Sequence, residues 1–189
     1  MPVILASTSP IRRQLLDAAG LDYEAVAPNV DEAEIKMRFA GPEEIAGGLA
    51  AAKACSVPGE WVIGSDSVVN VDGQSFDKPR DRAQAAEHLR FFSGKAMILT
   101  SAVALARDGE EDWRHVGSAS LQVRTLSNEF IQDYLDAEWP DVGYCVGVFR
   151  LEGRGVQLFE TIDGDHFTIL GMPLLPLLAA LRARGLMPR

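Results

Sequence analysis

The sequence predicts an α/β domain built on a mixed sheet flanked by helices. Short apolar runs that end in turn residues alternate with segments in which apolar residues recur at helical spacing. Some predicted strands are connected through helices, as parallel neighbours are, and others through tight turns, as antiparallel neighbours are. At 189 residues the chain has the length of one domain with a substantial core, so we expect residues 1–189 to form a single domain.

The first third of the chain predicts a strand and a helix, twice over. Residues 3–6 form a short apolar run, and apolar residues then recur at helical spacing over 11–19. Ser9 can cap this helix, Pro10 suits its first position, and Gly20 can end it in the left-handed conformation. A second extended segment over 23–27, an acidic turn over 31–34 and a second helix over 42–54 are expected next.

The rest of the chain predicts both hairpins and further helices. Residues 61–66 predict a strand that brings Asp66 near the carboxyl edge of the sheet, and 68–73 predict a hairpin that turns at Asp72-Gly73. Beyond it the patterns predict a helix over 81–92, an antiparallel pair of strands over 97–107 and 113–123, a helix over 128–137 capped by Ser127, strands over 143–149 and 155–162, and a last helix over 173–184.

Charge and composition exclude several classes of function. Eighteen Lys plus Arg against 27 Asp plus Glu give a formal net charge of −9, which argues against binding duplex nucleic acid through a basic face. No apolar stretch approaches the length of a membrane span, and no signal peptide is recognisable, so a cytoplasmic location without membrane contact is expected. Cys55 and Cys145 are far apart and suggest buried apolar residues, with neither a zinc site nor a disulfide.

Two segments contain groups suited to phosphate or metal chemistry. Residues 7–13 place hydroxyls and backbone N–H groups at a helix N-terminus with two arginines nearby, which suits a phosphate. A capped helix with two solvated arginines is the alternative. Asp66 could hold a divalent cation or accept a proton from water, or it could simply hydrogen-bond within a turn.

Three further charged residues are candidates with plain alternatives. Lys78, fixed by the following Pro79, could serve as a point charge for phosphate or be a solvated loop lysine. Lys53 is one of four lysines and lies in an Ala-rich helical segment. Glu32 could add a second carboxylate to a metal site or belong to an acidic loop before a helix. The three histidines are scattered and have no spacing typical of metal ligands.

Taken in order, these segments resemble the Maf family of nucleoside triphosphate pyrophosphatases over almost the whole chain. The family pattern Leu-Ala-Ser-x-Ser-Pro-x-Arg is matched by residues 5–12, and its Asp-Glu element by 31–32. Its Ala-x-x-Lys-Ala helix corresponds to 50–54, its Asp-Thr/Ser-Val-Val segment to 66–69, and its Lys-Pro to 78–79. The Phe-x-Ser-Gly turn is represented by 92–94, and the closing Leu-Gly-Leu-Pro-Leu by 170–174.

The resemblance implies a fold, a reaction and a set of site residues. The fold is a twisted mixed sheet with two lobes around a central cleft, and the reaction is hydrolysis of a nucleoside triphosphate to the monophosphate and pyrophosphate. The implied roles are Asp66 as the general base, Ser7, Arg13, Lys53 and Lys78 as triphosphate ligands, and Glu32 with Asp66 beside a divalent cation, expected to be Mg²⁺. A homodimer is also implied. The alternative is a nucleotide-binding regulator of cell septation.

The choice of base depends on three positions of the resemblance. Ile11 and Glu152 occupy positions that differ between a branch acting on dTTP and UTP and a branch acting on 7-methyl-GTP, and Ser67 lies where the family varies. A carboxylate can accept hydrogen bonds from the N1–H and amine of guanine, but it would face carbonyl oxygens in thymine or uracil. Glu152 therefore favours a guanine-type base such as that of 7-methyl-GTP, with dTTP or UTP as the alternative.

An aromatic partner for that base is less evident from the sequence. Ile11 provides no aromatic face that could stack on a methylated ring. Phe149 could supply a replacement, or it could be a core aromatic residue.

Overall fold

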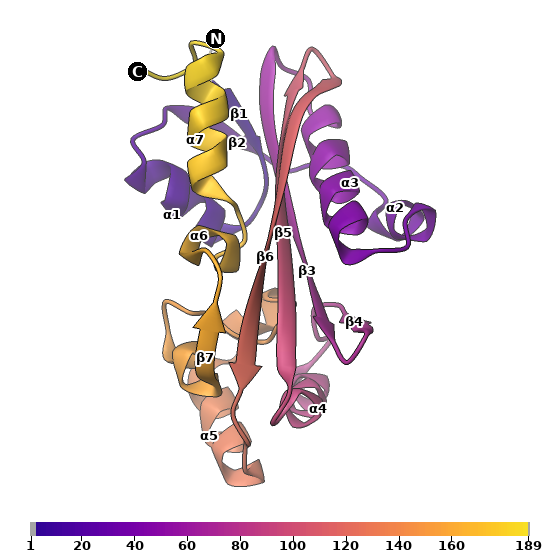
Figure 1. Cartoon of the computed structure of the whole chain (residues 1–189), viewed down its shortest axis with the longest axis vertical. Helices are drawn as coiled ribbons and strands as arrows, with labels where there is room; N and C mark the ends of the chain where they lie inside the picture. Colours follow the sequence, from indigo (N-terminus) through magenta and orange to yellow (C-terminus); the bar gives the residue numbers. More distant parts are fainter. Residues whose placement is uncertain (1–2, 189) are drawn as a thin grey trace. The chain divides into compact units, whose positions relative to one another are not determined.

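A computed structural model describes residues 3–188 and divides the chain into two compact units (Figure 1). The first unit comprises the chain up to Ser67, Thr100–Gly117 and the chain from Asp165 onward. The second comprises Val68–Leu99 and Ser118–Gly164. The expected single domain, and the cleft that the resemblance implies, stay predictions.

A mixed α/β architecture is confirmed within the described residues. A sheet of seven strands has the order β2-β1-β3-β5-β6-β7, with β4 paired to β3. β1 is parallel to both β2 and β3, whereas β4 is antiparallel to β3 and β7 is antiparallel to β6. The strands are β1 (Val3–Ala6), β2 (Tyr23–Val26), β3 (Trp61–Val71), β4 (Gln74–Phe76), β5 (Ala96–Arg107), β6 (Glu110–Val123) and β7 (Phe159–Asp163).

Helices cover both faces of the sheet in the first unit. Leu16 of α1 and Leu177 of α7 join Leu5 and Ile63 in one buried cluster, and α3 packs against the opposite face of β3 (Figure 1). The N-terminal and C-terminal segments therefore share a core. The helices of this unit are α1 (Pro10–Ala18), α2 (Glu32–Arg38), α3 (Pro42–Cys55), α6 (His166–Ile169) and α7 (Leu174–Ala183).

The second unit contains two helices joined by a hydrogen bond and a small cluster of aromatic side chains. Arg82 Nη1 donates to Gln132 Oε1 at 2.9 Å and so links α4 to α5. Phe76 packs edge-on against Phe92 and His88. The elements of this unit are α4 (Arg82–Phe92), α5 (Asn128–Glu138), the 3-10 turns η1 (Asp141–Tyr144) and η2 (Arg154–Leu158), and β4 and β7, together with parts of β3, β5 and β6.

The predicted acidic turn over 31–34 was wrong. Residues from Glu32 onward form α2, because Asp31 Oδ1 accepts a hydrogen bond from Glu34 N at 3.1 Å and caps the helix. The short helix α6 was also missed, and Asp165 caps it in the same way.

The predicted break after Asp66 was also wrong. β3 continues to Val71, so Asp66 lies in mid-strand and not at an edge of the sheet. The side chains of residues 65–67 alternate between the two faces of β3, so polar residues are accommodated without ending the strand. The expected turn at Asp72-Gly73 is confirmed, with φ of +51° and +76°.

The predicted strand over 143–149 was wrong as well. These residues lie in η1 and in irregular structure, where Val148 has a φ of +55° that a strand does not contain. The strand expected from residue 155 begins at Phe159. Cys55 and Cys145 are free, as expected, but they are half-buried where full burial was expected.

Candidate functional site

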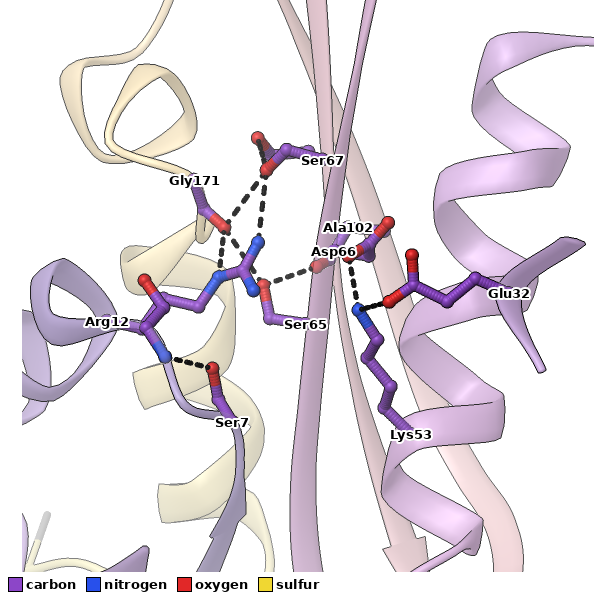
Figure 2. Close-up of polar contacts among 11 residues, drawn as sticks. Ser7, Arg12, Glu32, Lys53, Ser65, Asp66, Ser67, Ala102 and Gly171 are labelled. Atoms are coloured by element: carbon purple, nitrogen blue, oxygen red, sulfur yellow. Dashed lines mark hydrogen bonds and ion pairs between the residues drawn. The ribbon is translucent and has the colours of Figure 1, made fainter. Parts of the chain in front are cut away.

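Lys53 binds two carboxylates from different elements of the first unit. Its Nζ lies 2.6 Å from Asp66 Oδ1 and 2.8 Å from Glu32 Oε1 (Figure 2). The Lys53 side chain is 10% exposed and that of Asp66 14%, whereas Glu32 is 49% exposed. The cluster of these three residues, the Lys53 cluster, thus has one buried member, Lys53, one that is largely covered, Asp66, and one that reaches solvent, Glu32.

Local packing explains why these three side chains meet. Gly64 lets α3 approach β3 closely, since a Cβ there would lie 2.1 Å from Ala50 O and 2.5 Å from Ala54 N. Lys53, in the last turn of α3, is thereby brought opposite Asp66. The Asp31 cap starts α2 at Glu32, which places that carboxylate at the start of its helix.

The opposite face of β3 carries a network of hydroxyls. Ser65 Oγ donates to Gly171 O at 2.9 Å or to Ala102 O at 2.8 Å, and Ser67 Oγ lies 2.8 Å from Ser101 Oγ (Figure 2). Arg12 joins this network: its Nε donates to Gly171 O at 2.9 Å and its Nη2 to Ser67 Oγ at 3.2 Å. The Arg12 guanidinium is therefore held in one orientation.

The start of α1 places the other candidates of this segment. Ser7 is buried and its Oγ accepts a hydrogen bond from Ser9 N at 3.1 Å, while the Ser9 side chain does not cap the helix. Arg13 is exposed, and its Nη2 donates to Ser7 O at 3.5 Å. Ile11 is half-buried.

The family resemblance was read as implying Arg13, and not Arg12, as a triphosphate ligand. In the structure Arg12 is the arginine that reaches β3, through its hydrogen bond to Ser67. The signal was present, because the pattern Leu-Ala-Ser-x-Ser-Pro-x-Arg ends at Arg12 when it is read onto residues 5–12.

The remaining candidates belong to the second unit. Lys78 is exposed and lines a pocket of about 350 Å³ together with Arg80 and His88. Glu152 is exposed, and within residues 3–188 its carboxylate forms no hydrogen bond or ion pair. Phe149 is buried edge-on against Phe159, as a core aromatic residue would be.

Comparisons with known proteins identify the family of the chain. The model of the Maf-like protein family matches residues 2–184. The chain belongs to the Maf family. A nucleoside triphosphate pyrophosphatase of Sphingopyxis alaskensis is 46% identical over the full length of both chains, and a 7-methyl-GTP pyrophosphatase of Rhizobium meliloti is 46% identical over 97% of this chain and 96% of its own.

A solved structure is also similar to this Maf chain. A nucleoside-triphosphatase (dITP/XTP pyrophosphatase) of Mycobacterium abscessus aligns with a TM-score of 0.40 and 20% identity, over 65% of this chain and 73% of that one, a likeness too weak to establish a common fold. Within residues 3–188 no helix of the Maf chain is both long and apolar enough for a membrane span.

The donor set of the Maf chain limits which metal it could hold. Among the described residues no group of three or more His, Cys, Asp or Glu side chains converges as a metal site. Glu32 and Asp66 are two carboxylates that converge on one positive group. Such a pair fits a cation that takes one or two protein carboxylates and completes its shell with water and phosphate, as Mg²⁺ does.

Proposed function

We propose that this Maf protein hydrolyses a nucleoside triphosphate to the nucleoside monophosphate and pyrophosphate, with Asp66 as the general base. The Lys53 cluster carries the proposal, because it combines a buried ammonium with a largely covered carboxylate and a solvent-facing one. The names of its full-length relatives support the same reaction.

The proposed step uses Asp66 to activate water. Its carboxylate accepts a proton as the water oxygen bonds to the α-phosphorus; the bond from that phosphorus to the bridging oxygen breaks, and its electron pair leaves with pyrophosphate. A positioned general base contributes about 10²–10⁴-fold to such a rate. The ion pair to Lys53 keeps the carboxylate in one orientation, which this proton transfer requires.

Cationic groups and backbone donors hold the triphosphate in this proposal. Ser7, Arg13, Lys53 and Lys78 are the ligands that the family resemblance implies, and Arg12 joins them because its guanidinium is already oriented by Gly171 and Ser67. Such local positive charge is needed because the protein has a net charge of −9. Glu32 and Asp66 would hold Mg²⁺, which supplies charge neutralisation of the phosphates when bound.

The proposed substrate has a guanine-type base, such as that of 7-methyl-GTP. Glu152 supports this choice, because its carboxylate is exposed and can accept hydrogen bonds from N1–H and the exocyclic amine of guanine. Ile11 and Ser67 are the other proposed specificity positions. Relatives named 7-methyl-GTP pyrophosphatase are 45–47% identical to this chain, which supports the same choice.

Pyrophosphate release with Mg²⁺ tests the reaction and the base together. We expect 7-methyl-GTP to be preferred over GTP, dTTP and UTP. Asp66→Asn should lower kcat by about 10³-fold, with folding intact by circular dichroism. Glu152→Gln should remove the preference for 7-methyl-GTP. Glu160→Gln, an exposed carboxylate in β7, is the matched control and should keep it. Release from no nucleotide would contradict the hydrolase and favour a binding regulator; preference for dTTP or UTP would contradict the role of Glu152.

Quaternary state and location are part of the same proposal. The protein acts as a homodimer in the cytoplasm, as its family resemblance implies. Sedimentation velocity at micromolar concentration should give the mass of two 20.5 kDa chains, and a monomeric mass would contradict it.

A further inference from the structure

The segment that carries Glu152 is attached to α5 at two points. The Tyr134 hydroxyl donates to Val148 O at 3.0 Å, and Arg150 Nη2 donates to Glu138 Oε2 at 3.0 Å. Tyr134 and Glu138 are four residues apart and so lie on one face of the helix. Both are buried, so the Tyr134 hydrogen bond lies in the interior of the second unit, whereas the Arg150 side chain is half-buried and joins Glu138 at the edge of that interior.

Arg150 begins the turn in which Glu152 lies. Gly153 N–H donates to Arg150 O at 3.1 Å, so residues 150–153 close a tight turn with Glu152 as its third residue. Gly155 packs directly on the Arg150 backbone, since a Cβ there would lie 2.4 Å from Arg150 O and 2.7 Å from Arg150 N. The first residue of the turn, Arg150, is therefore fixed twice. Its backbone packs against Gly155, and its side chain binds Glu138.

The guanidinium of Arg150 is held by two carboxylates. Besides Glu138, its Nη1 lies 3.0 Å from Asp141 Oδ2. A planar guanidinium that binds two carboxylates has a defined orientation, which the point charge of a lysine does not reproduce. Glu152 is exposed, and the charge of Arg150 also acts on its carboxylate; the 150–153 turn determines where that carboxylate lies.

We infer that Arg150 is a positioning residue for base selection: its ion pairs with Glu138 and Asp141 hold the 150–153 turn so that the Glu152 carboxylate meets the base in a fixed place. This inference rests on the proposed function, in which Glu152 recognises a guanine-type base. Arg150 acts through Glu152 and has no part in the attack on phosphorus. Its loss affects the choice between nucleotides and leaves the rate on a poor substrate unchanged.

The test compares kcat and KM for 7-methyl-GTP and UTP in single and double variants. Arg150→Gln should lower the ratio of the two kcat/KM values about tenfold, through a higher KM for 7-methyl-GTP, with the values for UTP unchanged. In a Glu152→Gln background the same substitution should have no further effect on the ratio. Arg154→Gln, the matched control, removes an exposed arginine of the same segment and should leave the ratio at its native value.

Arg150→Lys keeps a positive charge next to buried Glu138, and it replaces Arg150→Gln in the test if that variant does not fold. Its ratio of kcat/KM values for the two nucleotides should lie between those of Arg150→Gln and the native protein.

A native ratio in folded Arg150 variants, an equal loss with both nucleotides, or a further loss in the Glu152→Gln background would overturn the inference. If Glu152→Gln alone keeps the preference, the proposed role of Glu152 fails first. If Glu152→Gln loses it and the Arg150 variants do not, the inference about Arg150 alone fails. A native protein without any preference overturns both.

Discussion

His88 is a titratable residue that packs as an aromatic one. Its ring meets Phe76 edge-on at 5.1 Å between centroids, and its Nδ1 is buried with no hydrogen-bond partner among residues 3–188. Burial lowers the pKa of His88 below its usual 6.5, and the nearby charges of Glu87 and Asp77 oppose this in part. Protonation is therefore easier in the unfolded chain than in the folded protein.

The sign of the resulting pH effect follows from proton binding. Below pH 6.5 the unfolded state binds more protons at this position, so the free energy of unfolding should fall as the pH is lowered through 6.5. Urea unfolding at pH 7.5 and 5.5 measures it, and His88→Leu should show a smaller fall than the native protein. His166→Leu, at an exposed position, is the control. An equal fall in the native protein and His88→Leu would show that other groups cause it.

At the level of single residues, the sequence names candidates for the site but not the contacts between them. Resemblance singled out Glu32, Lys53 and Asp66, and the structure brings these three together. Nothing in the spacing of the sequence says that one ammonium binds both carboxylates, because that contact depends on how closely α3 approaches β3. The choice of Arg13 over Arg12 has a different origin, because the family pattern read onto residues 5–12 already ends at Arg12.

At the level of elements, the contact between α3 and β3 determines whether the Lys53 cluster can form. Gly64→Ala would push a methyl group into the backbone of α3, which cannot move as a side chain can. We expect it to lower the free energy of unfolding by about 3 kcal/mol or more and to reduce activity. Gly41→Ala, where a Cβ meets nothing within 4 Å, should cost about 1 kcal/mol or less.

Chemical denaturation of both variants, with pyrophosphate release at a temperature where each is folded, measures these effects. A Gly64→Ala protein as stable and active as the native one would show that α3 need not approach β3 this closely.

Regular elements were predictable where pattern and end signals agree. Strand β1, helix α1 and helix α5 were expected nearly at their observed bounds, because each has a clear apolar period and a clear start or stop. Helix α2 was not, since its seven residues bury no side chain completely and so show no apolar stripe. The irregular chain between η1 and η2 was misread because hydrophobic residues there serve the core without forming a strand.

At the scale of the whole molecule, β3, β5 and β6 belong to both units. Each of these strands crosses a unit boundary, so unfolding one unit breaks backbone pairing that continues into the other. We expect a single cooperative unfolding transition, as the prediction of one domain requires.

Tryptophans in the two units allow this to be measured. Trp61 and Trp113 lie in the first unit and Trp139 in the second. Fluorescence of Trp139→Phe therefore reports the first unit, and that of the double variant Trp61→Phe/Trp113→Phe the second. Their urea midpoints, each taken relative to circular dichroism of the same variant, should coincide; separate midpoints would mean two independently unfolding units.

The alternation of side chains along β3 has a consequence for how this protein can diverge. Ser65 and Ser67 face the arginine and glycine of one side, and Asp66 faces the lysine of the other (Figure 2). A substitution at one of these positions changes the contacts on one face of β3 and leaves those on the other face unchanged. An inserted or deleted residue upstream in the strand would exchange them, pointing the carboxylate at the Gly171 carbonyl and a hydroxyl at the ammonium. This stretch can therefore evolve by substitution, while the register of β3 within the sheet must stay constant.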